Sequence, residues 1–127
     1  MQPSGAVVTR AQPIVSIVLP TYNRADVIGR AIASVRAQTL ADWELLIVDD
    51  GSTDGTPDVV AGLDDRIHLL RQDNAGTYVA RNNGLARARG RYITFLDSDD
   101  EWLPHFLELT VGFLRAYPDA HFVTTEF

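Results

Sequence analysis

The chain has 127 residues, of which 46% are hydrophobic and 22% are charged, with a formal net charge of −6 and no cysteine. A chain of this length fits one domain and buries roughly two-thirds of its unfolded surface. The composition excludes disulfides and thiolate metal sites, the negative charge argues against non-specific nucleic-acid binding, and no apolar stretch approaches the ~18 residues of a membrane span. Residues 1–12 lack the basic start and apolar run of a secretory signal, so we expect a flexible lead-in there.

The first predicted unit is a strand followed by a helix. Residues 14–19 form a nearly continuous apolar run rich in β-branched side chains, which is typical of a strand covered on both faces of a parallel sheet. We expect this strand to end at Pro20, because proline cannot donate a hydrogen bond within a sheet. Apolar residues at helical spacing predict a helix over residues 25–37, and Asn23 with Asp26 resembles a capping box.

A second strand and a short helix come next. Residues 43–48 predict another buried strand, which stops at Asp49. After a turn, Thr56 and Pro57 fit the N-cap and the first position of a helix that ends near Gly62.

The rest of the chain repeats this alternation. The predicted elements are a weaker strand at 67–70, a helix at 77–89 closed by Gly90, a buried strand at 92–96, a helix at 105–116 and a fifth strand at 121–124. Repeated alternation of strands and helices predicts an α/β fold, a mostly parallel sheet with helices on both faces.

Polar residues follow each of the first four predicted strands. In open α/β sheets ligands bind beyond the carboxyl ends of the strands, so we expect these residues to converge on one edge of the sheet. The clusters are Thr21-Tyr22-Asn23, Asp49-Asp50-Gly51-Ser52, Gln72-Asp73-Asn74 and Asp97-Ser98-Asp99-Asp100.

The carboxylates of Asp97 and Asp99 are candidate ligands of a divalent cation. Alternate residues share a face while the backbone is extended, so both side chains can reach one cation held by oxygen ligands. Clustered carboxylates repel one another unless positive charge lies among them, and a cation with a phosphate on its far side would supply that charge. The alternative is a solvated turn in which an aspartate caps the next helix.

Four further residues have both a binding and a structural interpretation. The carboxylates of Asp49 and Asp50 could accept hydrogen bonds from a ligand, or they could belong to an ordinary polar turn. Tyr22 could stack on a base or pack within its loop. Arg81, near a helix start, could donate to phosphate oxygens or be a solvated helix arginine.

Four motifs, in their order and spacing, resemble those of the family 2 glycosyltransferases, which have the GT-A fold. The resemblance extends from about Pro13 to Phe127, and each motif is weak on its own. The motifs are Pro20-Thr21-Tyr22-Asn23-Arg24, Asp49-Asp50-Gly51-Ser52-Thr53-Asp54-Gly55-Thr56, Ala80-Arg81-Asn82-Asn83-Gly84 and Leu96-Asp97-Ser98-Asp99-Asp100.

The resemblance implies an enzyme whose donor is a nucleotide-diphosphate sugar, such as a UDP-sugar. It implies that Pro20, Thr21 and Tyr22 line the base pocket, with Tyr22 near the base. It also implies that Asp50 holds the base or the ribose, with Asp49 beside it.

The diphosphate end of the donor is assigned in the same way. Asp97 and Asp99 look like the D-x-D pair of the family, which binds Mn²⁺ or Mg²⁺ that bridges the diphosphate. Ser98, which lies between them, and Arg81 are further candidate contacts to the donor. A diphosphate approaching this many carboxylates would be repelled without a cation.

The resemblance also implies functions that lie outside this chain. Family members usually continue well beyond this length, with an acceptor site and an acidic general base for inverting attack. We therefore expect residues 13–127 to be a donor-binding domain truncated before the acceptor half, with the base beyond Phe127. Transfer by this chain alone is then not expected. The implied acceptor is a sugar, a lipid-linked molecule or a protein in cell-envelope polysaccharide biosynthesis, and the implied location is the cytoplasm or the cytoplasmic face of a membrane.

Three other classes share part of this pattern. A receiver domain also has an acidic metal site, but its acid pair follows the first strand and a lysine follows the last, whereas this chain has no lysine. A haloacid-dehalogenase-like phosphatase also uses D-x-D, but at the end of its first strand. A non-catalytic nucleotide-binding module is the third alternative, and it would bind a donor without transferring the sugar.

Overall fold

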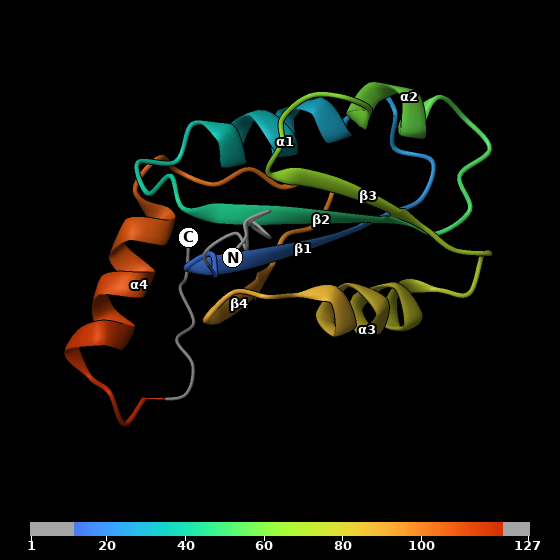
Figure 1. Ribbon diagram of the computed structural model, residues 1–127. Coiled ribbons are helices and arrows are strands. Elements are labelled where there is room, and N and C mark those ends of the chain that lie inside the picture. The colour runs from blue at the N-terminus through green and yellow to red at the C-terminus, as the bar shows by residue number, and fades with distance from the viewer. Residues whose placement is uncertain (1–11, 121–127) are drawn as a thin grey trace, which may run out of the picture.

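The computed structural model describes residues 12–120 (Figure 1), so the predicted lead-in, except for Gln12, and the strand predicted at 121–124 lie outside the described residues. Strands and helices alternate along the chain as the sequence predicts. In chain order they are β1 (Val15–Thr21), α1 (Ile28–Arg36), β2 (Trp43–Asp49), α2 (Thr56–Val60), β3 (Ile67–Arg71), α3 (Thr77–Arg87), β4 (Tyr92–Phe95) and α4 (Phe106–Ala116).

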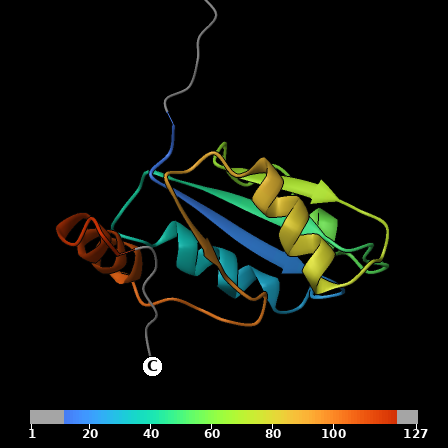
Figure 2. The same ribbon diagram turned by 90° about the horizontal axis from the view of Figure 1, so that it is seen from below.

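The four strands form one parallel sheet in the order β3-β2-β1-β4. Helices α1 and α2 lie on one face of the sheet and α3 lies on the other (Figure 1). Viewed from below, α3 crosses β1 and β2 (Figure 2). This arrangement confirms the predicted α/β fold with helices on both faces.

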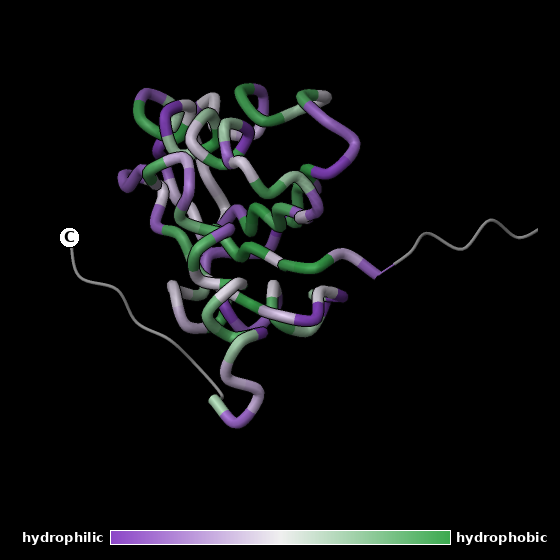
Figure 3. The backbone as a smooth tube through the Cα atoms, turned by 90° about the vertical axis from the view of Figure 1, so that its left-hand side faces the viewer, coloured by the Kyte–Doolittle hydropathy of each residue, from purple (hydrophilic) through white to green (hydrophobic). Residues whose placement is uncertain are grey.

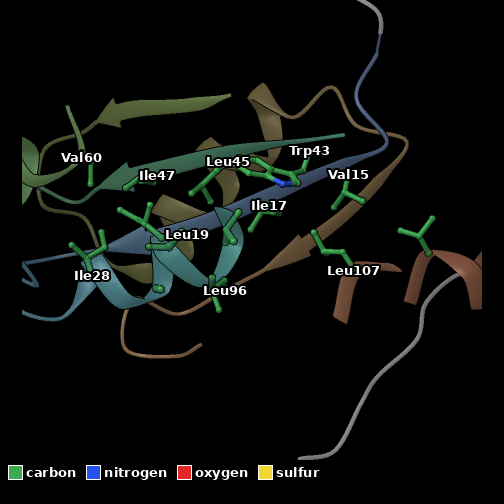
Figure 4. Close-up of a cluster of buried hydrophobic side chains, with 14 residues drawn as sticks. Val15, Ile17, Leu19, Ile28, Trp43, Leu45, Ile47, Val60, Leu96 and Leu107 are labelled. Carbon is green, nitrogen blue, oxygen red and sulfur yellow. The ribbon is translucent and has the colours of Figure 1, made fainter. Parts of the chain in front are cut away.

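The core is built around the two central strands. All residues of β1 and β2 are buried, as expected for strands covered on both faces. Figure 4 shows the larger apolar cluster, in which Ile28 of α1 lies near Leu19 and Leu107 of α4 lies near Val15. Helix α4 therefore closes the end of the core at which β1 begins.

Strand β4 is more exposed than its apolar sequence predicts. Ile93 and Phe95 are 42% and 45% exposed, so the prediction of a fully buried strand is wrong. Within residues 12–120, β4 pairs only with β1 and forms one edge of the sheet. Burial depends on which elements lie alongside a strand, and composition does not specify them.

Strand β1 continues through Pro20 to Thr21, so the predicted strand end at Pro20 is wrong.

The predicted helix boundaries need three further corrections. Helix α1 begins at Ile28, and no side chain caps it, so the capping box is wrong. Thr56 is the first residue of α2, and its N-cap is Gly55. Helix α3 ends at Arg87, short of the predicted end. The side chains of Asn23 and Thr56, which would otherwise cap the first two helices, accept hydrogen bonds from loop residues instead.

Hydrophobic segments of the backbone gather in the middle of the molecule, and hydrophilic segments lie mostly at its margins (Figure 3). Among residues 12–120, no helix combines the length and the hydropathy needed to cross a bilayer.

Gly84 allows α3 to approach the sheet closely. A Cβ atom at this position would lie 2.5 Å from Cγ1 of Val18 and 3.2 Å from Cγ2 of Val48. Both valines belong to the central strands, where packing leaves little room to relax.

We therefore expect the substitution Gly84→Ala to lower the free energy of unfolding by about 1–3 kcal/mol, because it overpacks this interface. Gly112→Ala in α4 is the matched control, since a Cβ atom there would meet no described residue outside its own helix within 4 Å. Replacing that glycine in a helix should raise stability slightly. Urea unfolding monitored by circular dichroism measures both changes, and equal effects of the two substitutions would contradict the close approach.

Candidate functional site

A cavity of about 340 Å³ lies at the carboxyl ends of the strands. Its wall combines the end of β1 and the segment after it with the segments that follow β2 and β4 and with the start of α3. The predicted convergence of polar segments on one edge of the sheet is therefore confirmed. The lining residues are Pro20, Thr21, Tyr22, Arg24, Asp50, Gly76, Thr77, Ala80, Asp97, Ser98 and Asp99.

Thr21 and Tyr22 both line this cavity, but they differ in burial. Thr21 is 4% exposed, and its hydroxyl has no hydrogen-bond partner among the described residues. A buried polar group without a partner is destabilising unless something else supplies the hydrogen bond. Tyr22 is 43% exposed, which leaves its ring available to a ligand. The cavity wall thus includes an exposed aromatic ring and a threonine whose buried hydroxyl is unpaired among the described residues.

Asn23 joins the loop after β1 to the loop after β2. It has a left-handed backbone, with φ 51°, a conformation that asparagine tolerates better than most residues. Its backbone N–H donates to Oγ of Ser52 at 2.8 Å, and its Oδ1 accepts from the N–H groups of Thr53 and Asp54 at 2.7 and 3.3 Å. These bonds fix the chain directly after Tyr22.

Asp50 holds the loop between β3 and α3 against the cavity. Its carboxylate accepts hydrogen bonds from the side chains of Gln72 and Asn74 at 2.8 and 3.2 Å, and from the N–H groups of Ala75 and Gly76 at 2.7 and 3.0 Å. Burial alone would raise the pKa of Asp50, but the bonds from Ala75, Gln72 and Gly76 lower it below its ordinary value. Asp50 is thus an ionised residue that shapes the wall.

Asp49 points away from the cavity. Its carboxylate is fully buried, and it accepts from Nε of Arg71 at 3.0 Å and from the N–H of Ser52 at 3.2 Å, as well as from the Ser52 hydroxyl. The geometry favours the structural interpretation of Asp49 over that of a ligand contact. Successive side chains at a strand end face opposite ways, which separates it from Asp50.

The D-x-D residues lie together on the cavity wall, as predicted. Asp97 and Asp99 are exposed, whereas Ser98 between them is buried, so the two carboxylates face the solvent side. Asp100 does not line the cavity, and its N–H donates to the carbonyl of Asp97 at 3.1 Å. The tight turn keeps both acidic side chains at the cavity.

The chemistry of this pair suits a hard divalent cation. Within residues 12–120, no three side chains of histidine, aspartate or glutamate gather into a complete metal site. Mg²⁺ is commonly held by only one or two carboxylates together with phosphate oxygens of the substrate and water. Two exposed carboxylates beside an open cavity provide such an incomplete set.

Arg81 does not line the cavity but contacts a residue that does. Its Nη2 lies 3.5 Å from Oδ1 of Asp97. Sequence reasoning missed four lining residues: Arg24, Gly76, Thr77 and Ala80. A glycine followed by threonine at a predicted helix start was the available signal for two of them, because such a start often approaches a ligand.

Residues 16–125 match the family described as Glycosyl transferase family 2. The chain is 46% identical over 110 residues to the putative teichuronic acid biosynthesis glycosyltransferase TuaG of Bacillus subtilis, covering 84% of this chain and 44% of that protein. The chain thus spans less than half the length of this relative.

Two solved structures resemble the fold. The S. aureus TarS fragment 1–349 in complex with UDP-GlcNAc has a TM-score of 0.79 and 28% identity, covering 83% of this chain and 32% of that chain. The mannosyltransferase PcManGT from Pyrobaculum calidifontis, in complex with GDP-Man and Mn²⁺, has a TM-score of 0.66 and 30% identity, covering 72% of this chain and 29% of that chain.

The role of Asp50 leads to a prediction about the loop that it holds. Asp50→Asn should lower the free energy of unfolding by about 1–3 kcal/mol, because an amide group cannot accept all of these hydrogen bonds. Hydrogen exchange at the N–H groups of Ala75 and Gly76 should speed up. Because the pKa of Asp50 is lowered by folding, its contribution is present above the ordinary aspartate pKa of about 3.9 and lost as the pH falls below it.

The matched control is Asp73→Asn, which changes an exposed residue of the same loop. Exchange at Ala75 and Gly76 should be unchanged in this control. Unaltered exchange in Asp50→Asn would show that the loop does not depend on this carboxylate.

Proposed function

Because the chain belongs to glycosyl transferase family 2, we propose that it is the donor-binding part of an enzyme that transfers a sugar from a nucleotide-diphosphate sugar to an acceptor. The observation that carries this proposal is a cavity lined by an exposed aromatic ring, by two exposed carboxylates and by a threonine whose buried hydroxyl is unpaired among the described residues. The complex of TarS with UDP-GlcNAc supports it. Family membership excludes the receiver and phosphatase alternatives.

The base and ribose would lie against the segment that follows β1. Tyr22 would stack on the base, and the Thr21 hydroxyl would gain from the nucleotide the hydrogen bond that the described residues do not supply. Pro20 belongs to the same wall. Asp50 would act mainly by holding the loop around Gly76, since its oxygens already accept four hydrogen bonds.

Asp97 and Asp99 would hold Mn²⁺ or Mg²⁺ at the diphosphate. A cation held there would supply positive charge that stabilises the negative charge developing on the departing nucleoside diphosphate. Without it, the carboxylates of the cavity would repel the diphosphate. The complex of PcManGT with GDP-Man and Mn²⁺ supports this part of the proposal.

The acceptor side of the reaction is proposed on chemical grounds. In-line attack by an acceptor hydroxyl would invert the anomeric centre and would need a general base to take the hydroxyl proton. The name of TuaG supports an acceptor in cell-envelope polysaccharide synthesis. We also propose a cytoplasmic location, including the cytoplasmic face of a membrane, because nucleotide sugars are made in the cytoplasm.

Titration of UDP with and without Mn²⁺ tests the metal assignment. We expect UDP to bind more tightly with Mn²⁺, and Asp99→Ala to weaken that binding at least tenfold, because a charged ligand contact is lost. Asp100→Ala is the control, since this acid lies next in the chain but does not line the cavity. If UDP binds as tightly without Mn²⁺ as with it, the assignment of Asp97 and Asp99 as metal ligands is wrong. Isothermal titration calorimetry gives all these affinities.

Thr21→Val tests the base pocket separately from the metal. The substitution removes a hydroxyl that bonds to nothing else among the described residues, so the free energy of unfolding should be unchanged or higher. UDP affinity should fall about fivefold, since the lost neutral hydrogen bond is worth roughly 1 kcal/mol. A stable variant that binds UDP as tightly as the wild type would exclude this contact.

A further inference from the structure

Gln38, just after α1, binds the segment that leads into α4. Its Nε2 donates to the carbonyl oxygen of Leu103 at 2.8 Å, and its Oε1 accepts from the N–H of Leu107 at 3.0 Å. The N–H of Thr39, the next residue, donates to the carbonyl oxygen of Pro104 at 2.9 Å. Three hydrogen bonds thus join the end of α1 to the start of α4, although the two are far apart in the sequence.

The buried side chain of Gln38 uses both ends of its amide group. The residue is only 7% exposed, and its Nε2 also donates to the carbonyl oxygen of Ser34 at 3.1 Å, which orients the amide. The N–H of Leu107 lies in the first turn of α4, where the helix itself provides no acceptor. Leaving a buried N–H unpaired is costly, so Gln38 stabilises this helix start and the segment before it together.

The acidic loop, residues 97–102, connects β4 to this anchor. Before it, the N–H of the buried Leu96 donates to the carbonyl oxygen of Val18 at 3.0 Å. At its other end, the ring of Trp102 stacks on the ring of Phe106, with 4.6 Å between the centroids. Figures 1 and 2 show this part of the chain running beside α1. The exposed carboxylates of the D-x-D pair therefore lie on a short segment that is held at both ends.

We propose that Gln38 is a positioning residue for the metal site, because it holds the end of the acidic loop and so keeps Asp97 and Asp99 at the cavity before a cation arrives. This inference rests on the function proposed above, in which the two carboxylates bind a cation. Gln38 does not line the cavity, so it acts through the backbone of the loop. Without a cation the two carboxylates repel each other and favour a looser loop. The anchor opposes that loosening and lowers the conformational entropy that metal binding would cost.

The variant Gln38→Met tests the anchor, because it keeps the length of the side chain and removes both of its hydrogen-bonding groups. Val111→Ala is the matched control. It removes buried atoms with which α4 packs on the core, and it leaves the hydrogen bonds of Gln38 in place. Both variants are compared with the wild type as the full 127-residue chain, at a temperature at which circular dichroism shows each one folded.

The first measurement needs no metal. The N–H of Asp100 donates to the carbonyl oxygen of Asp97 within the acidic loop. Hydrogen exchange at this N–H should be faster in Gln38→Met than in the wild type, and unchanged in Val111→Ala. Loosened packing of α4 alone would not produce that difference.

The second measurement is the increase in UDP affinity that Mn²⁺ produces, determined by isothermal titration calorimetry. We expect Gln38→Met to reduce this increase roughly fivefold, since about one more residue must be ordered when the cation binds. The affinity for UDP without metal should stay as in the wild type, because the base pocket does not depend on this loop end. In Val111→Ala both affinities should be those of the wild type.

Two results would overturn the role of Gln38. One is a wild-type increase in UDP affinity with Mn²⁺ in folded Gln38→Met, and the other is an equal loss of that increase in Val111→Ala. If Gln38→Met does not fold, Gln38→Glu replaces it, since a carboxylate can still accept from Leu107 but cannot donate to Leu103. The same loss is expected there, and its absence would equally overturn the role.

A failure of the proposed function is distinguishable from a failure of the anchor. If Mn²⁺ does not raise the UDP affinity of the wild type, the metal part of the proposed function is wrong, and this inference is wrong with it. If Mn²⁺ does raise it but exchange at Asp100 is unaltered in Gln38→Met, only the anchor is wrong.

Discussion

Two adjacent buried carboxylates at the end of β2 hold the loops on which the cavity depends. Asp49 turns toward Arg71 and the loop of Ser52, and Asp50 turns toward the loop that precedes α3. Side chains alternate along a strand, so one dipeptide can organise loops on both sides of it. Burying two charges is costly unless each is paired or fully hydrogen-bonded, and here both are. The cavity wall is therefore preorganised before any ligand arrives.

The polar groups of this edge divide into satisfied and unsatisfied ones. Asp49, Asp50 and Asn23 have their hydrogen bonds supplied by the protein, so they shape the wall. Within the described part of the chain, the Thr21 hydroxyl and Arg81 Nε lack partners, and the Asp97 carboxylate makes one long contact. An unsatisfied polar group in the wall of a cavity indicates where a ligand would complete the hydrogen bonding. Whether the protein itself satisfies a polar group, more than the type of residue, distinguishes the residues that shape the cavity wall from the candidate ligand contacts.

Particular residues show how far prediction from sequence reached. The central strands were predictable because strands covered on both faces require continuous apolar runs. The convergence of Tyr22, Asp50 and Asp97 followed from the connectivity of parallel sheets. The cap of α1 was not predictable, since the Asn23 side chain bonds across to the loop after β2. No local pattern distinguishes that long-range bond from a capping box.

The sequence by itself determined the alternation of strands and helices, the polar residues at the ends of the strands and the motifs of glycosyl transferase family 2. Those properties depend on local periodicity and chain connectivity, and both can be read directly from the order of the residues. Only the tertiary structure decided that Asp49 is enclosed while Asp50 faces the cavity, that β4 is half-exposed, and that Arg81 lies against Asp97. Each of those properties depends on which neighbours lie beside a residue in space. Burial and hydrogen bonding are set by such neighbours, so neighbouring acids of one chain acquire different roles.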